Sequence, residues 1–180
     1  FSGDKDKILS CDPADKGLDY TVIYAGERKN GRWRVYKTYS EAKSEQTSVA
    51  GRLYKMWELE SARNINIDYG MGVGIISILK EQIPGNKCKI TSCVFGSRPR
   101  DTRRFLNRKA EAYFRLADLF NTNNISIPKH ETLIKQLRSI KWRYSSNGKI
   151  QIVDPDKSPD FADSLVILTW DTGEGTYHLS

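Results

Sequence analysis

An Asn-Gly pair at residues 30 and 31 separates two stretches that are rich in β-branched and aromatic residues. A two-residue hairpin turn of type I′ needs positive φ at both central positions, which asparagine followed by glycine adopts readily. The flanking stretches, residues 19–26 and Trp33 to Tyr36, therefore predict two antiparallel strands. The apolar segment 6–12 predicts another strand ahead of them. The N-terminal part of the chain is thus expected to form an antiparallel three-stranded meander.

Beyond the meander, helix and strand patterns alternate. Apolar residues at helical spacing predict a helix over 45–62, and the short strand 64–68 is followed by a glycine-rich turn. The remaining segments are predicted in the order helix 73–82, strand 87–95, helix 101–120, helix 131–139, hairpin 141–152 around Asn147-Gly148, and helix 158–170. Strands that are joined through helices pair in parallel. The sequence therefore predicts an α/β fold, whose mixed β-sheet combines the antiparallel meander with parallel strands and carries helices on both faces.

The length and composition suit one globular domain. The chain has 180 residues, of which 38% are hydrophobic and 28% are charged, and a domain of this size needs no disulfide to fold. We expect a single domain over 1–180, in which 1–6 is a linker remnant and 171–180 a loose tail. No apolar run approaches the ~20 residues of a bilayer span, so no membrane partner is expected. The three cysteines, Cys11, Cys88 and Cys93, are expected to be reduced.

Four aspartates stand at positions where a site would form. Asp12 directly follows the first apolar strand, and Asp68 ends the strand before the glycine-rich turn. Asp160 and Asp163 lie in the first turns of the last predicted helix. Sites in open α/β sheets form at the carboxyl ends of strands, so Asp12 and Asp68 would meet if their strands are neighbours. Each aspartate alone is also a good turn or helix-start residue, which is the simpler alternative.

A cluster of such carboxylates needs a compensating cation. Two carboxylates about 4 Å apart repel each other by roughly 4 kcal/mol at an effective dielectric constant of 20. Either their pKa values rise or a metal ion binds. Oxygen ligands select Mg²⁺ or Mn²⁺, and two such ions ~3.5–4 Å apart catalyse the in-line displacement at a phosphodiester. The carboxylates therefore predict two-metal hydrolysis of a phosphodiester bond.

The basic residues point to a polyanionic partner. The net charge is +7, and a basic surplus favours nucleic acid. Two local clusters are candidate DNA contacts, one in the segment after the predicted strand 87–95 and one on the hairpin 141–152. Their members are Arg98, Arg100, Arg103 and Arg104, and Lys141, Arg143 and Lys149. The alternatives are a solvated helix start for the first cluster, and for the second an ordinary hairpin whose aromatic residues pack on the body of the domain.

Four segments, in this order, resemble motifs of one family. Asp12 to Ile23 has an aspartate, a glycine-containing turn, a second aspartate at Asp19 and an apolar strand. Residues 67–74 place an aspartate before a glycine turn and helix, 107–114 lies in a long helix, and 158–165 carries the last acids. Together they resemble the nuclease domain of the large terminase subunit of tailed bacteriophages, which belongs to the ribonuclease H-like superfamily.

The resemblance implies a ribonuclease H-like fold and two-metal cleavage of concatemeric double-stranded viral DNA during genome packaging. It implies that Asp12, Asp68 and Asp163 are catalytic and bind Mg²⁺ or Mn²⁺, with Asp160 assisting and Asp19 as an auxiliary ligand. The implied partners are double-stranded DNA, an ATPase motor domain of the full-length chain, the portal and the small terminase subunit, in the cytoplasm of the infected host. The P-loop pattern GxxxxGK[ST] of such a motor does not occur here, so the motor is expected to lie outside this chain.

Two other functions fit the same residues. A different ribonuclease H-like nuclease, such as a junction resolvase or an RNA–DNA hybrid nuclease, would use the same carboxylates on another substrate. A non-catalytic basic DNA-binding module would use the aspartates only as turn and cap residues. That module would bind DNA equally well in the presence of a chelator and would not cleave it at any metal concentration.

Overall fold

The computed structural model describes residues 6–14 and 19–171. A six-stranded sheet has the order β5-β4-β1-β2-β3-β6, and β7 and β8 form a separate two-stranded sheet. The strands are β1 (Asp6–Asp12), β2 (Tyr20–Lys29), β3 (Arg32–Ala42), β4 (Asn64–Asp68), β5 (Lys89–Cys93), β6 (Ile125–Ser126), β7 (Lys141–Tyr144) and β8 (Ile150–Val153). The helices are α1 (Gln46–Glu60), α2 (Tyr69–Gln82), α3 (Arg108–Asn121), α4 (Glu131–Ser139) and α5 (Asp160–Leu168).

The mixed pairing of the large sheet agrees with the prediction. The strands β1, β2 and β3 form an antiparallel meander, and the turn between β2 and β3 has positive φ at both Asn30 and Gly31. The strands β4 and β5 add in parallel beside β1. The structure thus contains the antiparallel meander and the parallel strands in one sheet.

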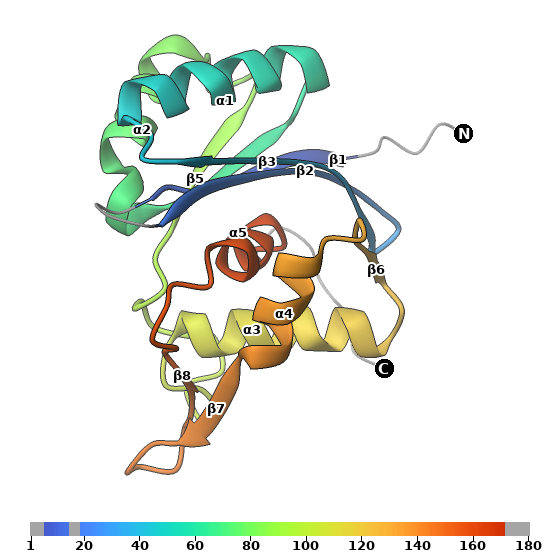
Figure 1. The fold of residues 1–180 in the computed structure, drawn as a ribbon, viewed down its shortest axis with the longest axis vertical. Helices are drawn as coiled ribbons and strands as arrows, with labels where there is room; N and C mark the ends of the chain where they lie inside the picture. The colour runs from blue at the N-terminus through green and yellow to red at the C-terminus, as the bar shows by residue number, and fades with distance from the viewer. Residues whose placement is uncertain (1–5, 15–18, 172–180) are drawn as a thin grey trace.

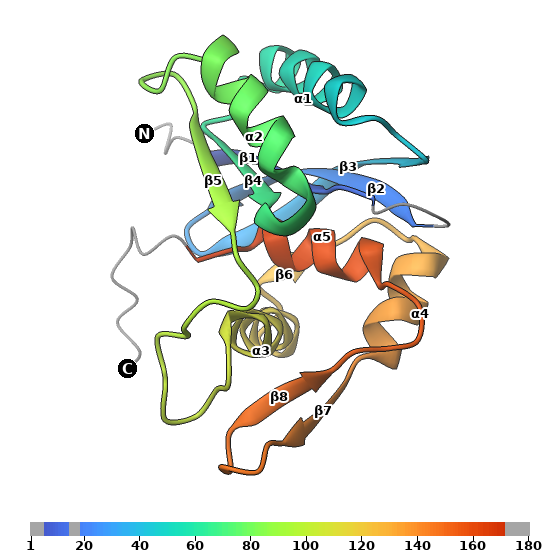
Figure 2. The same ribbon diagram turned by 90° about the vertical axis from the view of Figure 1, so that its left-hand side faces the viewer.

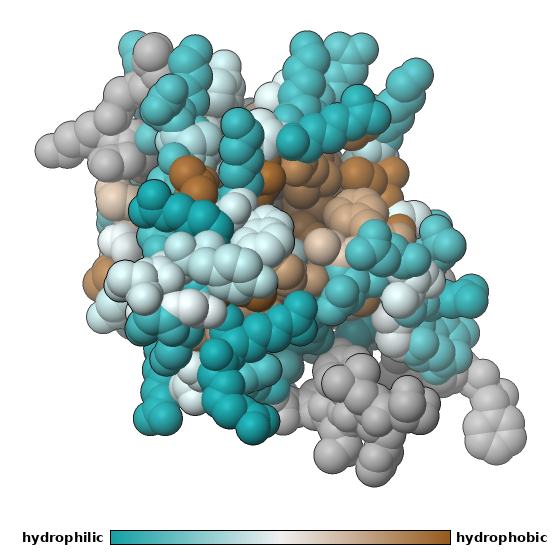
Figure 3. All heavy atoms as spheres, turned by 90° about the horizontal axis from the view of Figure 1, so that it is seen from below, coloured by the Kyte–Doolittle hydropathy of each residue, from teal (hydrophilic) through white to brown (hydrophobic). Residues whose placement is uncertain are grey.

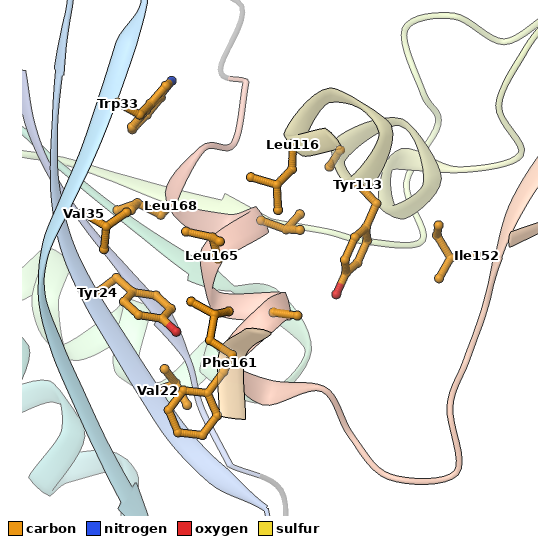
Figure 4. Close-up of a cluster of buried hydrophobic side chains, with 14 of the residues drawn as sticks. Val22, Tyr24, Trp33, Val35, Tyr113, Leu116, Ile152, Phe161, Leu165 and Leu168 are labelled. Atoms are coloured by element: carbon orange, nitrogen blue, oxygen red, sulfur yellow. The ribbon is translucent and has the colours of Figure 1, made fainter. Parts of the chain in front are cut away.

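Helices cover both faces of the sheet. In Figure 1, α1 and α2 lie on one face, whereas α3, α4 and α5 lie on the other. Each face buries its own apolar cluster, with Leu9, Ile65 and Leu53 in the first and Tyr24, Leu116 and Leu165 in the second. Figure 4 shows that α5 is the layer between the strands and α3. The α/β fold with helices on both faces is therefore confirmed.

Two predicted helix starts were wrong. The glycine-rich segment is not a turn but the first turns of α2, because the Asp68 carboxylate caps the helix by accepting a hydrogen bond from the Met71 N–H at 3.2 Å. The third helix begins at Arg108 rather than at residue 101. The Asp101 carboxylate instead caps a separate turn by accepting the N–H groups of Arg103 and Arg104, both at 3.1 Å. The Leu106 N–H donates to the Ile150 carbonyl at 2.9 Å, which joins this loop to the hairpin.

Other predicted segments differ only in extent or lie outside the described residues. The predicted strand 87–95 is shorter, as β5, and β6 was not predicted. Asp6, which we assigned to a linker remnant, begins β1 and pairs with Arg28. The rest of the linker, the glycine turn within 15–18 and the tail from 172 lie outside the described residues. All three cysteines are buried free thiols, and no described helix is long and apolar enough to cross a membrane.

The hairpin β7–β8 projects from the lower end of the molecule (Figure 1). Its Trp142 packs edge-on against Phe114 of α3 but is 48% exposed, and Tyr144 is 65% exposed. Between α3, α4 and this hairpin lies an apolar cavity of about 500 Å³. Figure 3, which views the molecule from below, shows apolar side chains there inside a hydrophilic rim. Trp142 therefore packs on the body of the domain, whereas Tyr144 remains largely exposed on the hairpin.

Gly72 in α2 allows close packing of the helix on the sheet. A Cβ atom at this position would lie 2.5 Å from Ile67 Cγ2, and Ile67 is fully buried. We expect Gly72→Ala to lower the free energy of unfolding by about 1–2 kcal/mol, because overpacking costs more than the ~1 kcal/mol that alanine gains over glycine in a helix. Urea unfolding followed by circular dichroism measures this change.

Gly74→Ala is the matched control for that prediction. Its Cβ would meet Gln46 Oε1, the tip of an exposed side chain that can rotate away at the cost of its solvent-exposed hydrogen bond to the Met71 carbonyl. We expect Gly74→Ala to leave stability unchanged or to raise it by up to about 1 kcal/mol. Equal destabilisation by both substitutions would contradict the packing role of Gly72.

Candidate active site

The sheet brings the first two predicted acids to one edge. Asp12 and Asp68 are the last residues of β1 and β4. These strands pair in parallel, and Cys11 lies opposite Ile67 in the register. Because the carboxyl ends of neighbouring parallel strands coincide, the residues that follow this pair stand side by side. The condition under which Asp12 and Asp68 were expected to meet is therefore fulfilled.

The helix α5 adds the other two acids. Asp160 and Asp163 occupy its first turn and are 6% and 7% exposed. Figure 2 shows α5 beneath the end of β4 and the start of α2. The Tyr20 N–H donates to Asp160 Oδ2 at 2.8 Å, and the Tyr113 hydroxyl donates to Asp163 Oδ1 at 2.6 Å. Two hydrogen bonds thus orient the two buried carboxylates.

Buried polar contacts fix α5 on the sheet. The Ser164 hydroxyl donates to the Val22 carbonyl at 2.9 Å, and its oxygen lies 3.0 Å from the Ser10 hydroxyl. On β4, the Asn66 amide donates to the Ile167 carbonyl at 3.0 Å. Buried hydrogen bonds have strict geometry and are costly to leave unmade. They hold the acids of α5 in register with those of β1 and β4.

The four carboxylates share one electrostatic environment. Burial raises the pKa of Asp12 well above its usual value, and the negative charges of Asp163, Asp68 and Asp160 raise it further. Burial likewise raises the pKa of Asp163, to about 6. Burial also raises the pKa of Asp68, although the N–H groups of the first turn of α2 oppose this shift. Burial raises the pKa of Asp160, and the nearby charge of Asp19 raises it further.

Lys109 supplies the positive charge next to this cluster. Burial lowers the pKa of its ammonium, but the charges of Asp163, Asp154 and Asp12 outweigh that effect and raise it overall. The ammonium donates to Asp154 Oδ1 at 2.7 Å. Lys109 and Tyr113 are four residues apart on α3 and therefore share a face of the helix. Sequence reasoning did not single them out, although a lysine on an otherwise apolar helical stripe is an available signal.

The donor chemistry of the cluster fits a hard divalent cation. Its members offer only carboxylate oxygens, which are the ligands that Mg²⁺ and Mn²⁺ prefer. Among the residues that the structure describes, no group of three or more His, Cys, Asp or Glu side chains is already arranged around one point to hold a metal ion. The fit to a cation therefore rests on the donor chemistry of the cluster, with Asp12, Asp68 and Asp163 as the candidate ligands.

The residues predicted to contact DNA lie on the loop after β5 and on the hairpin. Arg98, on the loop after β5, and Lys149, on the hairpin, line one cavity of about 550 Å³. The side chains of Arg103, Arg104, Lys141 and Arg143 are exposed. Arg100 instead pairs with the Asp171 carboxylate, which Arg115 also contacts at 2.9 Å. The loop and the hairpin thus form one basic surface, in which Arg100 already has a carboxylate partner.

Comparisons with known proteins find similarity in structure only. No family profile and no curated protein matches the sequence. The nuclease domain of the large terminase subunit of bacterial virus Sf6 superposes with a TM-score of 0.76 at 20% identity, covering 91% of this chain and 87% of that one. The magnesium-bound large terminase nuclease from thermophilic phage G20c gives 0.68 at 17%, covering 93% and 82%.

A third structure is that of a longer protein. The large terminase from thermophilic bacteriophage D6E superposes with a TM-score of 0.64 at 15% identity, and the match covers 90% of this chain and 38% of that protein. The three similarities extend over almost the whole of the present chain, across the sheet and the helices on both of its faces. The chain therefore has the ribonuclease H-like α/β fold of the nuclease domains of phage large terminase subunits.

Proposed function

We propose that this protein is a divalent-metal-dependent endonuclease that cleaves double-stranded DNA, and that it acts in the packaging of a phage genome. The observation that carries the proposal is the convergence of four carboxylates from β1, β4 and α5, where burial and the charges of the other acids together raise the pKa values of Asp12 and Asp163. The similar folds support it, since they are those of terminase nucleases, some of them with bound magnesium or manganese.

In this proposal, Asp12, Asp68 and Asp163 are the principal metal ligands. Asp160 would assist them, and Asp19, whose charge acts on Asp160, would be an auxiliary ligand. Two bound ions would supply the Lewis-acid chemistry of phosphodiester hydrolysis. Residues of the chain orient the carboxylate ligands. The Met71 N–H in the first turn of α2 holds the Asp68 carboxylate, and the Tyr113 hydroxyl holds the Asp163 carboxylate.

The basic surface would position the duplex. Phosphate contacts from arginine and lysine fix a nuclease on DNA without reading its sequence. The candidates are Arg98, Arg103 and Arg104 on the loop and Lys141, Arg143 and Lys149 on the hairpin, and Arg100 would have to exchange Asp171 for a phosphate. Such contacts predict cleavage without strong sequence preference.

The test is cleavage of supercoiled plasmid DNA with Mg²⁺, with Mn²⁺ or with a chelator. The proposal predicts metal-dependent nicking and linearisation, and loss of both in Asp12→Ala. Four-way junctions and RNA–DNA hybrids are offered in parallel. Preferential cleavage of either would identify a resolvase or a hybrid nuclease instead. DNA binding that persists in chelator, without cleavage at any metal concentration, would identify a binding module.

The basic surface makes a separate prediction about salt. Each phosphate contact that is lost reduces the slope of log affinity against log salt by about 1. We expect Arg98→Ala combined with Arg103→Ala to weaken binding to DNA of any sequence and to reduce this slope by about 2. Fluorescence anisotropy with a labelled duplex in chelator measures both quantities.

Lys55→Ala, which removes an exposed charge from α1 on the other face of the sheet, is the control. It is expected to leave the affinity and the salt slope unchanged. An equal loss of affinity in Lys55→Ala would mean that net charge, rather than the loop, determines binding.

The proposed cellular setting follows from the similar folds. The D6E large terminase is more than twice as long as the matched region, which supports an ATPase motor as a partner domain. The portal, the small terminase subunit and concatemeric viral DNA would be the other partners, in the cytoplasm of the infected host. Copurification of the chain with a packaging motor during infection tests this setting.

A further inference from the structure

Lys109 lies between two sets of carboxylates. On one side is the buried cluster, where its charge acts on Asp163 and Asp12. On the other side is Asp154, whose Oδ1 accepts its hydrogen bond at 2.7 Å. The side chain of Lys109 is 18% exposed and that of Asp154 is 80% exposed. The lysine thus connects the interior of the site to its rim.

Asp154 stands where the hairpin rejoins the body of the domain. It is the first residue after β8, and the next helix is α5, which carries Asp163. The Ile150 N–H donates to the Arg104 carbonyl at 2.8 Å, which fixes the start of β8, at the turn end of the hairpin, to the loop before α3. At the other end of β8, Val153 pairs with Lys141 of β7, so the hairpin fixes the backbone next to Asp154 without involving its side chain.

An ammonium and a divalent cation compete for the same carboxylates. A lysine paired with Asp12 and Asp163 would neutralise the charge that attracts the metal and occupy oxygen atoms that the metal needs. A partner outside the cluster removes this competition without removing the lysine from the site. Asp154 is such a partner, because it is exposed and its oxygen accepts the hydrogen bond of Lys109.

We propose that Asp154 is a positioning residue, which holds the Lys109 ammonium at the rim and thereby leaves Asp12 and Asp163 available to divalent cations. The inference rests on the proposed function in one respect, namely that the cluster binds such cations. It assigns to the connection between hairpin and α5 a role in metal affinity. That role depends on the hydrogen bond between Lys109 and Asp154, and Asp154 lies outside the carboxylate cluster.

The first measurement is Mn²⁺ binding by isothermal titration calorimetry, which needs no DNA and no cleavage. We expect Asp154→Asn to weaken Mn²⁺ binding about fivefold. Residues in one hydrogen-bond network are energetically coupled, and losing one contact commonly changes an equilibrium constant by about this factor. Asp154→Glu, which keeps a carboxylate partner, is expected to retain wild-type affinity. Asp156→Asn removes the same charge from an exposed position two residues away and is expected to change the affinity less than twofold.

A double variant separates positioning from direct effects of the Asp154 charge. In a Lys109→Met background there is no ammonium to position. Adding Asp154→Asn is therefore expected to keep the Mn²⁺ affinity within about twofold of that of Lys109→Met alone. An equal loss in both backgrounds would show that Asp154 acts as a ligand or through its own charge. No loss in either background would overturn the proposal.

The second measurement tests positioning without metal. Acetylation of Lys109 by a water-soluble reagent, followed by peptide mass spectrometry, reports how far the ammonium reaches solvent. In Asp154→Asn we expect slower labelling of Lys109, because the ammonium moves toward the buried carboxylates. Faster or unchanged labelling would overturn the inference. If the wild type binds no Mn²⁺, the proposed function fails, while this labelling result still decides the position of Lys109.

Discussion

Asp68→Asn is expected to lower metal-dependent cleavage of plasmid DNA by at least about 10³-fold while leaving the fold intact. An amide is a weak ligand for a hard cation, and a loss of about 4 kcal/mol in transition-state stabilisation corresponds to this factor. Asparagine is the informative replacement, because it caps a helix as well as aspartate does and so preserves the start of α2. Cleavage is measured from initial rates with saturating Mn²⁺.

Two controls make that result specific. Asp156→Asn changes an exposed aspartate outside the cluster and should cleave at the wild-type rate. Circular dichroism and urea unfolding of Asp68→Asn should show a free energy of unfolding that is not reduced, since the substitution relieves repulsion within the cluster. Cleavage by Asp68→Asn at the wild-type rate would remove Asp68 from the proposed metal site.

Asp163→Asn is expected to stabilise the metal-free protein at pH 7 by about 3 kcal/mol. Burial raises the pKa of Asp163 to about 6, whereas an aspartate in an unfolded chain has a pKa of about 3.9. A difference of about 2 pKa units at 1.36 kcal/mol each gives this figure. The asparagine carbonyl still accepts the Tyr113 hydroxyl, so the substitution removes the charge and retains the hydrogen bond.

The sign of the pH dependence follows from proton binding. Between about pH 4 and pH 6 the folded state holds a proton on Asp163 that the unfolded state has lost. The contribution of this group to stability is therefore greatest below about pH 4 and falls as the pH rises to about 6. In chelator, urea midpoints of the wild type should decrease over this window by more than those of Asp163→Asn. Parallel pH profiles for the two proteins would contradict the raised pKa.

Much of the fold was predictable because its local signals agree with its long-range contacts. The Asn30-Gly31 turn determines the β2–β3 hairpin, and strand patterns beside crossover helices indicate the parallel part of the sheet. The start of α3 was not predictable from apolar periodicity, since that pattern continues through Phe105 and Leu106. There the contact with Ile150 of the hairpin, more than forty residues later in the sequence, decides the conformation.

The aspartates of the candidate site could be predicted from the sequence, but the residues that contact and position them could not. Asp12 and Asp68 follow recognisable strands, so a sequence pattern can find them. Their neighbour Lys109 stands out as a lysine on an apolar helical stripe, but its hydrogen-bond partner Asp154 lies 45 residues away in sequence. The register of α5 likewise depends on the serine pair between Ser10 and Ser164, which are separated by 154 residues. Such contacts have no local signature.

The complete burial of α5 has a consequence for reading mutational tolerance. All nine of its residues are buried, so nearly every substitution along it should reduce the amount of folded protein. A mutational scan selected on activity alone would find the whole helix intolerant and would not distinguish the acids from the apolar residues beside them. Scoring abundance separately resolves the two classes. Apolar positions would lose abundance and activity together, whereas neutral replacements at Asp163 would keep or gain abundance while losing activity.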